Sequence, residues 1–123
     1  MNNNIKIISA FLICIFLSTC KDYRTQKKEI KKYTSVQSEL IDTLIYKSNS
    51  LVTGIKLNIK GNSKGVFSFS YSHKPYKNGN SIELENSFNE TIKTDWYEPE
   101  CVIKIIPSNG ASIDSLSLSY EFY

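Results

Sequence analysis

Strict alternation of apolar and polar residues is the feature of this sequence that most limits its possible folds. Apolar side chains occupy every second position in residues 55–59 (IKLNI), 67–71 (FSFSY) and 116–122 (LSLSYEF). Successive side chains of a strand point to opposite faces of a sheet, so this pattern is typical of strands with one buried face and one wet face. A helix would instead repeat its apolar residues every three or four positions. The pattern therefore predicts antiparallel β-structure.

The first two alternating runs are separated by residues 61–65 (GNSKG), which have the composition of a turn. Two strands joined by a short glycine-bounded loop form a hairpin. We therefore expect a hairpin over residues 55–71, with the apolar residues of both runs on one buried face. These residues are Ile55, Leu57, Ile59, Phe67, Phe69 and Tyr71.

Further short strands are predicted along the rest of the chain, separated by loops rich in Gly, Pro and Asn. Residues 38–47 are ambiguous between a helix and a strand, and their second half favours a strand. Six or seven strands at spacings near ten residues predict an all-β domain, an antiparallel two-sheet sandwich. The other predicted strands are residues 82–84, 88–92, 101–106 and 116–122.

The N-terminus has a different character. Lys6 precedes an uncharged run of eleven residues, 7–17 (IISAFLICIFL), and small residues follow it, which is the pattern of a secretory signal peptide. As a helix, residues 7–19 would rise roughly 20 Å, short of the roughly 30 Å hydrocarbon core of a membrane. We therefore expect residues 1–19 to be a cleaved signal peptide, the alternative being an uncleaved anchor.

The exit of this run, Leu17-Ser18-Thr19-Cys20, resembles the lipobox of bacterial lipoproteins. The resemblance implies cleavage before Cys20, a diacylglycerol on its sulfur and an acyl chain such as palmitate on the new amine. Two or more chains hold a protein on a membrane essentially permanently. Lys21-Asp22 is similar to the short signal that directs some Bacteroidota-type lipoproteins to the cell surface. The resemblance thus implies a cell-envelope protein, lipid-anchored to the outer membrane on its periplasmic or surface face.

Charge divides the expected mature chain into two parts. Residues 21–32 contain six basic and two acidic residues, whereas residues 33–123 contain eight lysines and ten acidic residues. We expect residues 20–37 to be the lipidated Cys and a flexible basic linker, and residues 38–123 to be the β-sandwich domain. The linker is either drawn to anionic headgroups or a solvated spacer. The acidic domain does not suggest a nucleic-acid interface.

The cysteines predict no internal disulfide. Cys14 would leave with the signal peptide and Cys20 would carry lipid, so that Cys101 remains alone. We expect Cys101 to be buried and inert, the alternative being a reactive or intermolecular thiol.

The residues that carry chemistry are sparse, and the sequence predicts no enzyme, metal site or cofactor. His73 is the single histidine, and no nucleophile, zinc or phosphate-loop motif is present. Asp95, Glu98 and Glu100 surround Pro99, and such carboxylates either bind calcium, cleave glycosidic bonds or belong to a solvated turn.

Asp95-Trp96-Tyr97 is the most unusual local cluster, and with Tyr76 it is the candidate binding site. Trp96 either plugs the domain with its indole N–H bonded to backbone, or forms an exposed platform that Tyr71 would extend. Two functions remain open. The first is a non-catalytic module that binds a protein or glycan through aromatic loops, which an exposed Trp96 would favour. The second is a structural or immunity-type lipoprotein that binds a protein through a sheet edge or face, which a buried Trp96 would favour.

Overall fold

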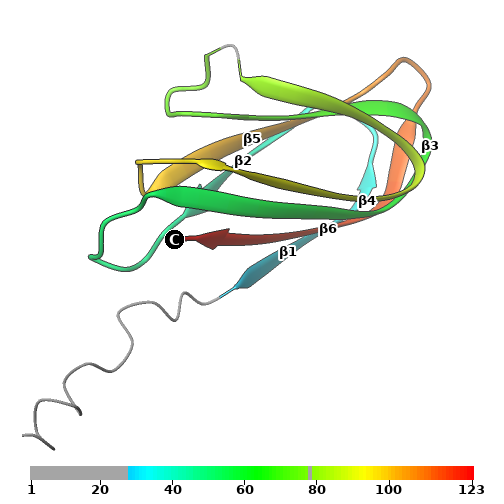
Figure 1. Cartoon of the computed structure of the whole chain (residues 1–123). Coiled ribbons are helices and arrows are strands. Elements are labelled where there is room, and N and C mark those ends of the chain that lie inside the picture. Colours follow the sequence, from blue (N-terminus) through cyan, green and yellow to red (C-terminus); the bar gives the residue numbers. More distant parts are fainter. Residues whose placement is uncertain (1–27, 78) are drawn as a thin grey trace, which may run out of the picture.

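The computed structural model describes residues 28–77 and 79–123, and the secondary-structure elements within these residues are all strands. The predicted signal peptide, Cys20 and the first part of the predicted linker lie outside these residues. The part of the chain that is described contains no helix long and apolar enough to cross a membrane. The strands are β1 (Glu29–Val36), β2 (Leu40–Ile45), β3 (Gly54–Ser72), β4 (Asn80–Asp95), β5 (Glu100–Pro107) and β6 (Ser112–Phe122) (Figure 1).

All six strands belong to one antiparallel sheet, with the order β1-β6-β3-β5-β2 and with β4 paired to the other side of β3. The long strand β3 pairs first with β6, over residues 55–64, and then with β5, over residues 67–72. β4 accompanies β3 through both parts. β3 and β4 therefore connect two halves of the sheet, one containing β1 and β6 and the other containing β5 and β2.

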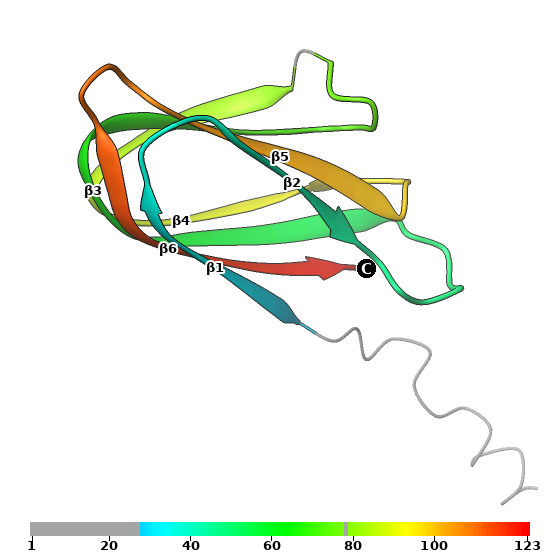
Figure 2. The ribbon, with the colours of Figure 1, turned by 180° about the vertical axis from the view of Figure 1, so that it is seen from behind.

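The sheet curls into an open half-barrel, because β3 and β4 bend between the two halves (Figures 1 and 2). The all-β antiparallel prediction is confirmed. Two separate sheets are not confirmed, because the same two strands run through the bend and keep their hydrogen bonds on either side of it.

The predicted hairpin over residues 55–71 is wrong, because both alternating runs lie in the single strand β3. Residues 61–65 form a bulge rather than a turn. Between the pairs Asn62–Ser87 and Val66–Glu85, three residues of β3 face one residue of β4, Asn86. Bulges bend a strand and increase its twist, so this insertion accounts for the corner of the half-barrel.

The predicted buried face is nevertheless confirmed, because the bulge adds two residues to β3 relative to β4. An even insertion leaves the alternation of side chains in phase, so the apolar residues before and after it face the same interior. The six residues predicted for this face are all buried: Ile55, Leu57, Ile59, Phe67, Phe69 and Tyr71.

Gly61 is required by close packing rather than by a turn. A Cβ atom at this position would collide with the backbone oxygen of Ser115 on β6. Gly65, at the end of the bulge, has φ +82°, a conformation that L side chains rarely adopt. Gly61 thus permits the close approach of β3 to its neighbour β6, and Gly65 permits the bend that follows.

Two predicted boundaries are corrected. The strands expected at 82–84 and 88–92 are one strand, β4, in which Asn86 takes a left-handed φ of 57° opposite the bulge. The linker expected over residues 20–37 ends earlier, because Glu29–Val36 form β1 and pair with β6. Most inward positions of β1 carry long polar side chains instead of apolar ones, and the composition of this segment therefore favoured a linker.

The remaining strand predictions are confirmed. Residues 40–45 form a strand, residues 101–106 lie within β5, and the C-terminal run lies in β6 between β1 and β3. The carbonyl oxygen of Tyr123 accepts hydrogen bonds from the amides of Thr53 (2.6 Å) and Gly54 (2.7 Å), which hold the end of the chain.

Cys101 is buried on β5, as predicted. Burial raises the pKa of its thiol to about 12, although a hydrogen bond from the backbone of Ser72 acts in the opposite direction. A thiol with this pKa is protonated at neutral pH and is therefore a weak nucleophile.

Candidate functional site

Trp96, the centre of the predicted aromatic cluster, is buried. It follows the last residue of β4 and is only 4% exposed. Its indole Nε1 donates a 3.0 Å hydrogen bond to the backbone oxygen of Glu100, and its ring lies 6.2 Å from that of Tyr71. Trp96 therefore plugs the domain, which is one of the two roles expected from the sequence. It offers almost no free surface on which a ligand could stack.

The other residues of the candidate site do not gather into one platform. Asp95 is exposed at the end of β4, and Tyr97 is 70% exposed. Tyr76 lies in the loop after β3, where its hydroxyl and that of Ser70 are hydrogen-bonded at 2.8 Å. The ammonium of Lys104 lies 5.0 Å from the centre of the Tyr76 ring. An exposed aromatic contact in this region would therefore depend on Tyr97.

His73 covers Trp96, a contact that the sequence reasoning missed. The two rings are stacked at 4.1 Å with an angle of 12° between their planes. The Nδ1 atom of His73 lies 3.3 Å from a carboxylate oxygen of Glu98. No local pattern joins residues 73 and 96, which lie beyond opposite ends of the β3–β4 register. They meet because the end of β3 pairs with β5, whose first residues follow the turn that carries Trp96.

A hollow of 510 Å³ opens beside this stack, between the loop after β3 and the turn after β4. His73, Lys74, Lys77 and Glu98 line it with polar groups. Lys74 also approaches Glu100 at 3.5 Å, so Glu98 and Glu100 each face a basic side chain. Among the described residues, no three His, Cys, Asp or Glu side chains are grouped so that they could hold a metal ion.

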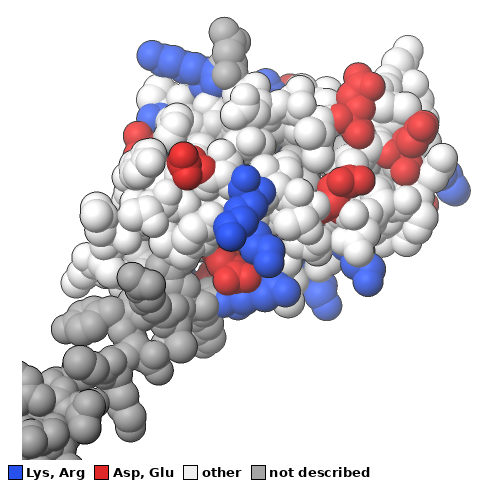
Figure 3. All heavy atoms as spheres, viewed as in Figure 1, with Lys and Arg blue, Asp and Glu red and all other residues white. Residues whose placement is uncertain are grey.

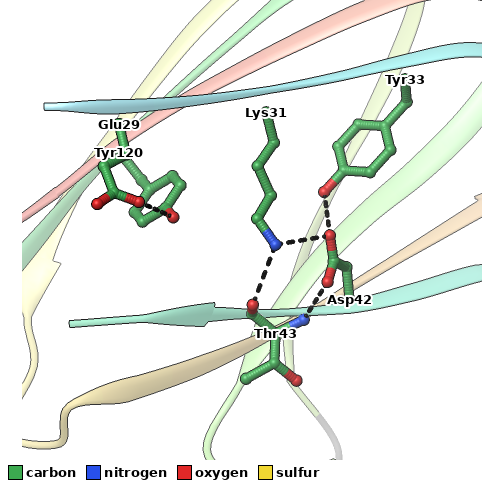
Figure 4. A network of polar contacts seen from close by, with 6 residues as sticks. All are labelled: Glu29, Lys31, Tyr33, Asp42, Thr43 and Tyr120. Atoms are coloured by element: carbon green, nitrogen blue, oxygen red, sulfur yellow. Dashed lines mark hydrogen bonds and ion pairs between the residues drawn. The ribbon is translucent and has the colours of Figure 1, made fainter. Parts of the chain in front are cut away.

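The open seam of the half-barrel, between β1 and β2, is bridged by side chains (Figure 4). Asp42 of β2 accepts a hydrogen bond from the hydroxyl of Tyr33 (2.6 Å) and one from the ammonium of Lys31 (2.9 Å), both on β1. Lys31 also donates to the backbone oxygen of Thr43 at 3.3 Å, and the amide of Thr43 donates to Asp42 at 2.8 Å. The two end strands of the sheet, which share no backbone pairing in the strand order, are thus connected.

Electrostatics in this seam favour a charged Asp42 and a neutral Tyr33. Burial alone would raise the pKa of Asp42, but the hydrogen bonds from Tyr33, Lys31 and Thr43 together lower it below its usual value. Burial, followed by the hydrogen bond to Asp42, raises the pKa of the Tyr33 hydroxyl. The seam is therefore an ion pair reinforced by a neutral donor.

Exposed isoleucines follow the outer surface beside the same seam. Ile41 and Ile45 point away from the interior on the edge strand β2 and are 56% and 48% exposed. Ile106, on the outer face of the neighbouring strand β5, is also exposed. A strand with one wet face normally carries polar residues at these positions. Nothing in the sequence alone singles out these residues.

Comparison with known proteins gives no family for this chain. No protein-family model matches it, and neither does any curated protein. Two solved structures of the Tobacco streak virus coat protein are among those that align with it. One, in a C2 crystal form, has a TM-score of 0.41 and 5% identity, covering 83% of this chain and 90% of the coat protein. The other, a coat protein dimer, has a TM-score of 0.43 and 7% identity, covering 84% and 89%.

Proposed function

We propose that this chain is an exported lipoprotein, lipid-anchored to the outer membrane through Cys20, whose β-domain binds a protein partner without catalysis. The anchor is supported by the apolar run of residues 7–17 and by its exit, Leu17-Ser18-Thr19-Cys20, which resembles a lipobox. In this proposal the two halves of the curled sheet act as the two layers of a sandwich-like domain, and the function is structural or immunity-type protection.

The observation that carries the binding proposal is the pair of exposed isoleucines on the edge strand β2. An edge strand presents unpaired backbone groups, and proteins normally protect such strands with charge. β2 instead carries Ile41 and Ile45 on its outer face. A partner that packs on the outer face of β2 would cover these isoleucines, and it would leave in place the contacts of Lys31 with Asp42 and Thr43 on the seam side of the strand.

A glycan ligand is the less favoured alternative. Sugar faces stack on exposed aromatic rings, and Trp96 is covered by His73 and is 4% exposed. The exposed ring of Tyr97 remains as the basis for that reading.

In vivo photo-cross-linking tests the proposed surface. A photo-reactive amino acid in place of Ile45 should form a discrete adduct with one envelope protein. The matched control is the same amino acid in place of Leu51, which is apolar and 83% exposed but lies in the loop after β2. We expect no such adduct from position 51, and we expect Ile41→Lys to abolish the adduct from position 45.

Identical adducts from both positions would mean that the cross-linker reports proximity to abundant proteins, and no adduct from position 45 would mean that β2 is not the interface. Either result contradicts the proposal.

A further inference from the structure

Lysines dominate the outer face of the half-barrel wall that contains β1 and β6. The register places Lys56 and Lys60 of β3 on this face, with Lys93 of β4 opposite Lys56 and Lys32 of β1 opposite Ser117 of β6. Lys28 borders the same surface. The acidic residues at outward positions of this wall are Glu121 and Asp95, so the five lysines leave it positively charged.

A polar hollow of 310 Å³ lies within this face. Three lysines and one carboxylate line it, together with amide and hydroxyl groups: Lys28, Lys56, Lys60 and Glu121, with Asn58, Asn89, Thr91 and Ser119. The amide of Asn58 is held in place by bonds to the Oδ1 atom of Asn89 (2.9 Å) and to the Oγ1 atom of Thr91 (3.1 Å). Lysine ammonium groups around amide and hydroxyl groups are suited to phosphate oxygens.

The lysines around the hollow are free to meet a ligand. Within residues 28–77 and 79–123, no carboxylate oxygen lies within 4.0 Å of the ammonium groups of Lys28, Lys56 or Lys60. Lys56 and Lys93 also face each other directly across β3 and β4. Like charges in such a pair repel, and an anion between them would relieve the repulsion.

Charge is segregated on the domain, although residues 28–123 contain eleven lysines and eleven acidic residues. Figure 3 shows basic side chains gathered along the lower side of the molecule and acidic side chains toward the bend on the right. Glu83 and Glu85 of β4 lie next to that bend. A domain with such a charge distribution is oriented by an anionic surface even where its net charge is not positive.

We infer that this lysine face docks on the phosphate headgroups of an anionic membrane. The inference rests on the proposed anchorage at Cys20. Lys28 is eight residues after Cys20, so at most about 29 Å separates them when the chain is fully extended. The start of β1, where the lysine face begins, therefore stays close to the lipid surface. This short reach favours headgroups over a soluble anionic polymer as the occupant.

Lysine acylation on reconstituted vesicles tests this inference. The full chain is placed in phosphatidylcholine vesicles with or without phosphatidylglycerol, and mass spectrometry measures the rate at which an amine-reactive reagent modifies each lysine. One lysine near an anionic surface changes binding about fivefold. We expect anionic vesicles to slow modification of Lys56 and Lys60 by about this factor or more, with Lys74 and Lys77 of the distant loop as internal controls.

Matched variants separate the face from overall charge. Lys56→Gln/Lys60→Gln should abolish the protection of Lys93, whereas Lys74→Gln/Lys77→Gln, with the same change in charge, should preserve it. High salt should also remove the protection, because it shortens the screening length. Equal protection of the face and loop lysines, or no protection of either, overturns the inference.

Two further outcomes are informative. If added heparin protects the lysines on neutral vesicles while anionic vesicles do not protect them, the inference is also overturned. The ligand of the lysine face would then be a soluble anionic polymer. Release of the chain from the vesicles would count against the proposed anchorage, whereas retention without protection counts against docking alone.

Discussion

Replacing Asp42 by Ala tests whether the side-chain seam holds the half-barrel together. Asp42 accepts three hydrogen bonds, and two of them, from Tyr33 and Lys31, connect β2 to β1. A hydrogen bond to a charged group contributes about 1.5–3 kcal/mol when buried. The side chains of Lys31 and Asp42 are each 33% exposed, so solvent screening lowers the contribution of that pair to about 1 kcal/mol or less. We therefore expect Asp42→Ala to lower the free energy of unfolding by about 2–3 kcal/mol.

The measurement is urea denaturation followed by circular dichroism, with Asp114→Ala as the control. Asp114 is an exposed carboxylate on β6, and within the described residues no basic side chain lies within 4.0 Å of it. Its loss should change stability by less than about 0.5 kcal/mol. In a double-mutant cycle, Tyr33→Phe and Asp42→Ala should be coupled by about 1 kcal/mol, since they share one bond.

The pH dependence gives the sign of the effect. The folded state lowers the pKa of Asp42, so the stability that this carboxylate contributes is present above its unfolded pKa of about 4 and is lost as pH falls further. The folded state raises the pKa of Tyr33, so its contribution is present below about pH 10 and is lost at higher pH. A cost for Asp42→Ala equal to that of Asp114→Ala, or unchanged between neutral pH and strong acid, would refute this reasoning.

Three other predictions concern the anchor, the core and the C-terminus. Cells grown with a labelled fatty acid should label the wild-type chain but not Cys20→Ala, and equal labelling of both would end the lipoprotein proposal. Phe67→Ala should lower the free energy of unfolding by about 3–5 kcal/mol, because Phe67 is fully buried, whereas the outward Ser68→Ala should change it little; a cost below about 1 kcal/mol for Phe67 would contradict the assigned face. Deleting residues 118–123 should abolish cooperative unfolding in thermal melts, because β6 lies between β1 and β3, while deleting residues 21–27 should leave the melting temperature almost unchanged. The reverse pattern would place the domain boundary at the wrong end.

Alternation identified the strands and the buried face, because it depends only on neighbours along the chain. It could not distinguish a turn at residues 61–65 from a bulge, since a bulge that inserts two residues preserves the phase of the alternation. Whether Gly61 begins a loop or permits close packing depends on Ser115, more than fifty positions away. The connectivity of β3 was therefore hidden in contacts that only the folded chain makes.

The candidate site was predictable only in its residue types. An indole bonded to backbone was one of the two readings of Trp96, and this is the contact that the structure contains. The partner that covers it, His73, lies in a loop whose own residues suggest no contact with Trp96. β1 was missed for a similar reason, since its inward residues Lys31 and Tyr33 both bond to Asp42, a contact that no local pattern predicts.

The bend at residues 61–65 has a consequence for both proposed surfaces. Because the sheet curls there, the wall containing β1 and β6 and the wall containing β5 and β2 face each other across the interior (Figures 1 and 2). Their outer faces therefore point in different directions, one carrying the lysines and the other Ile41 and Ile45. If the lysine face lies on headgroups, the isoleucines are directed away from the membrane and remain accessible to a protein partner. The two proposals are thus compatible in one orientation of the domain, and a flat sheet with the same strands would not separate the two faces in this way.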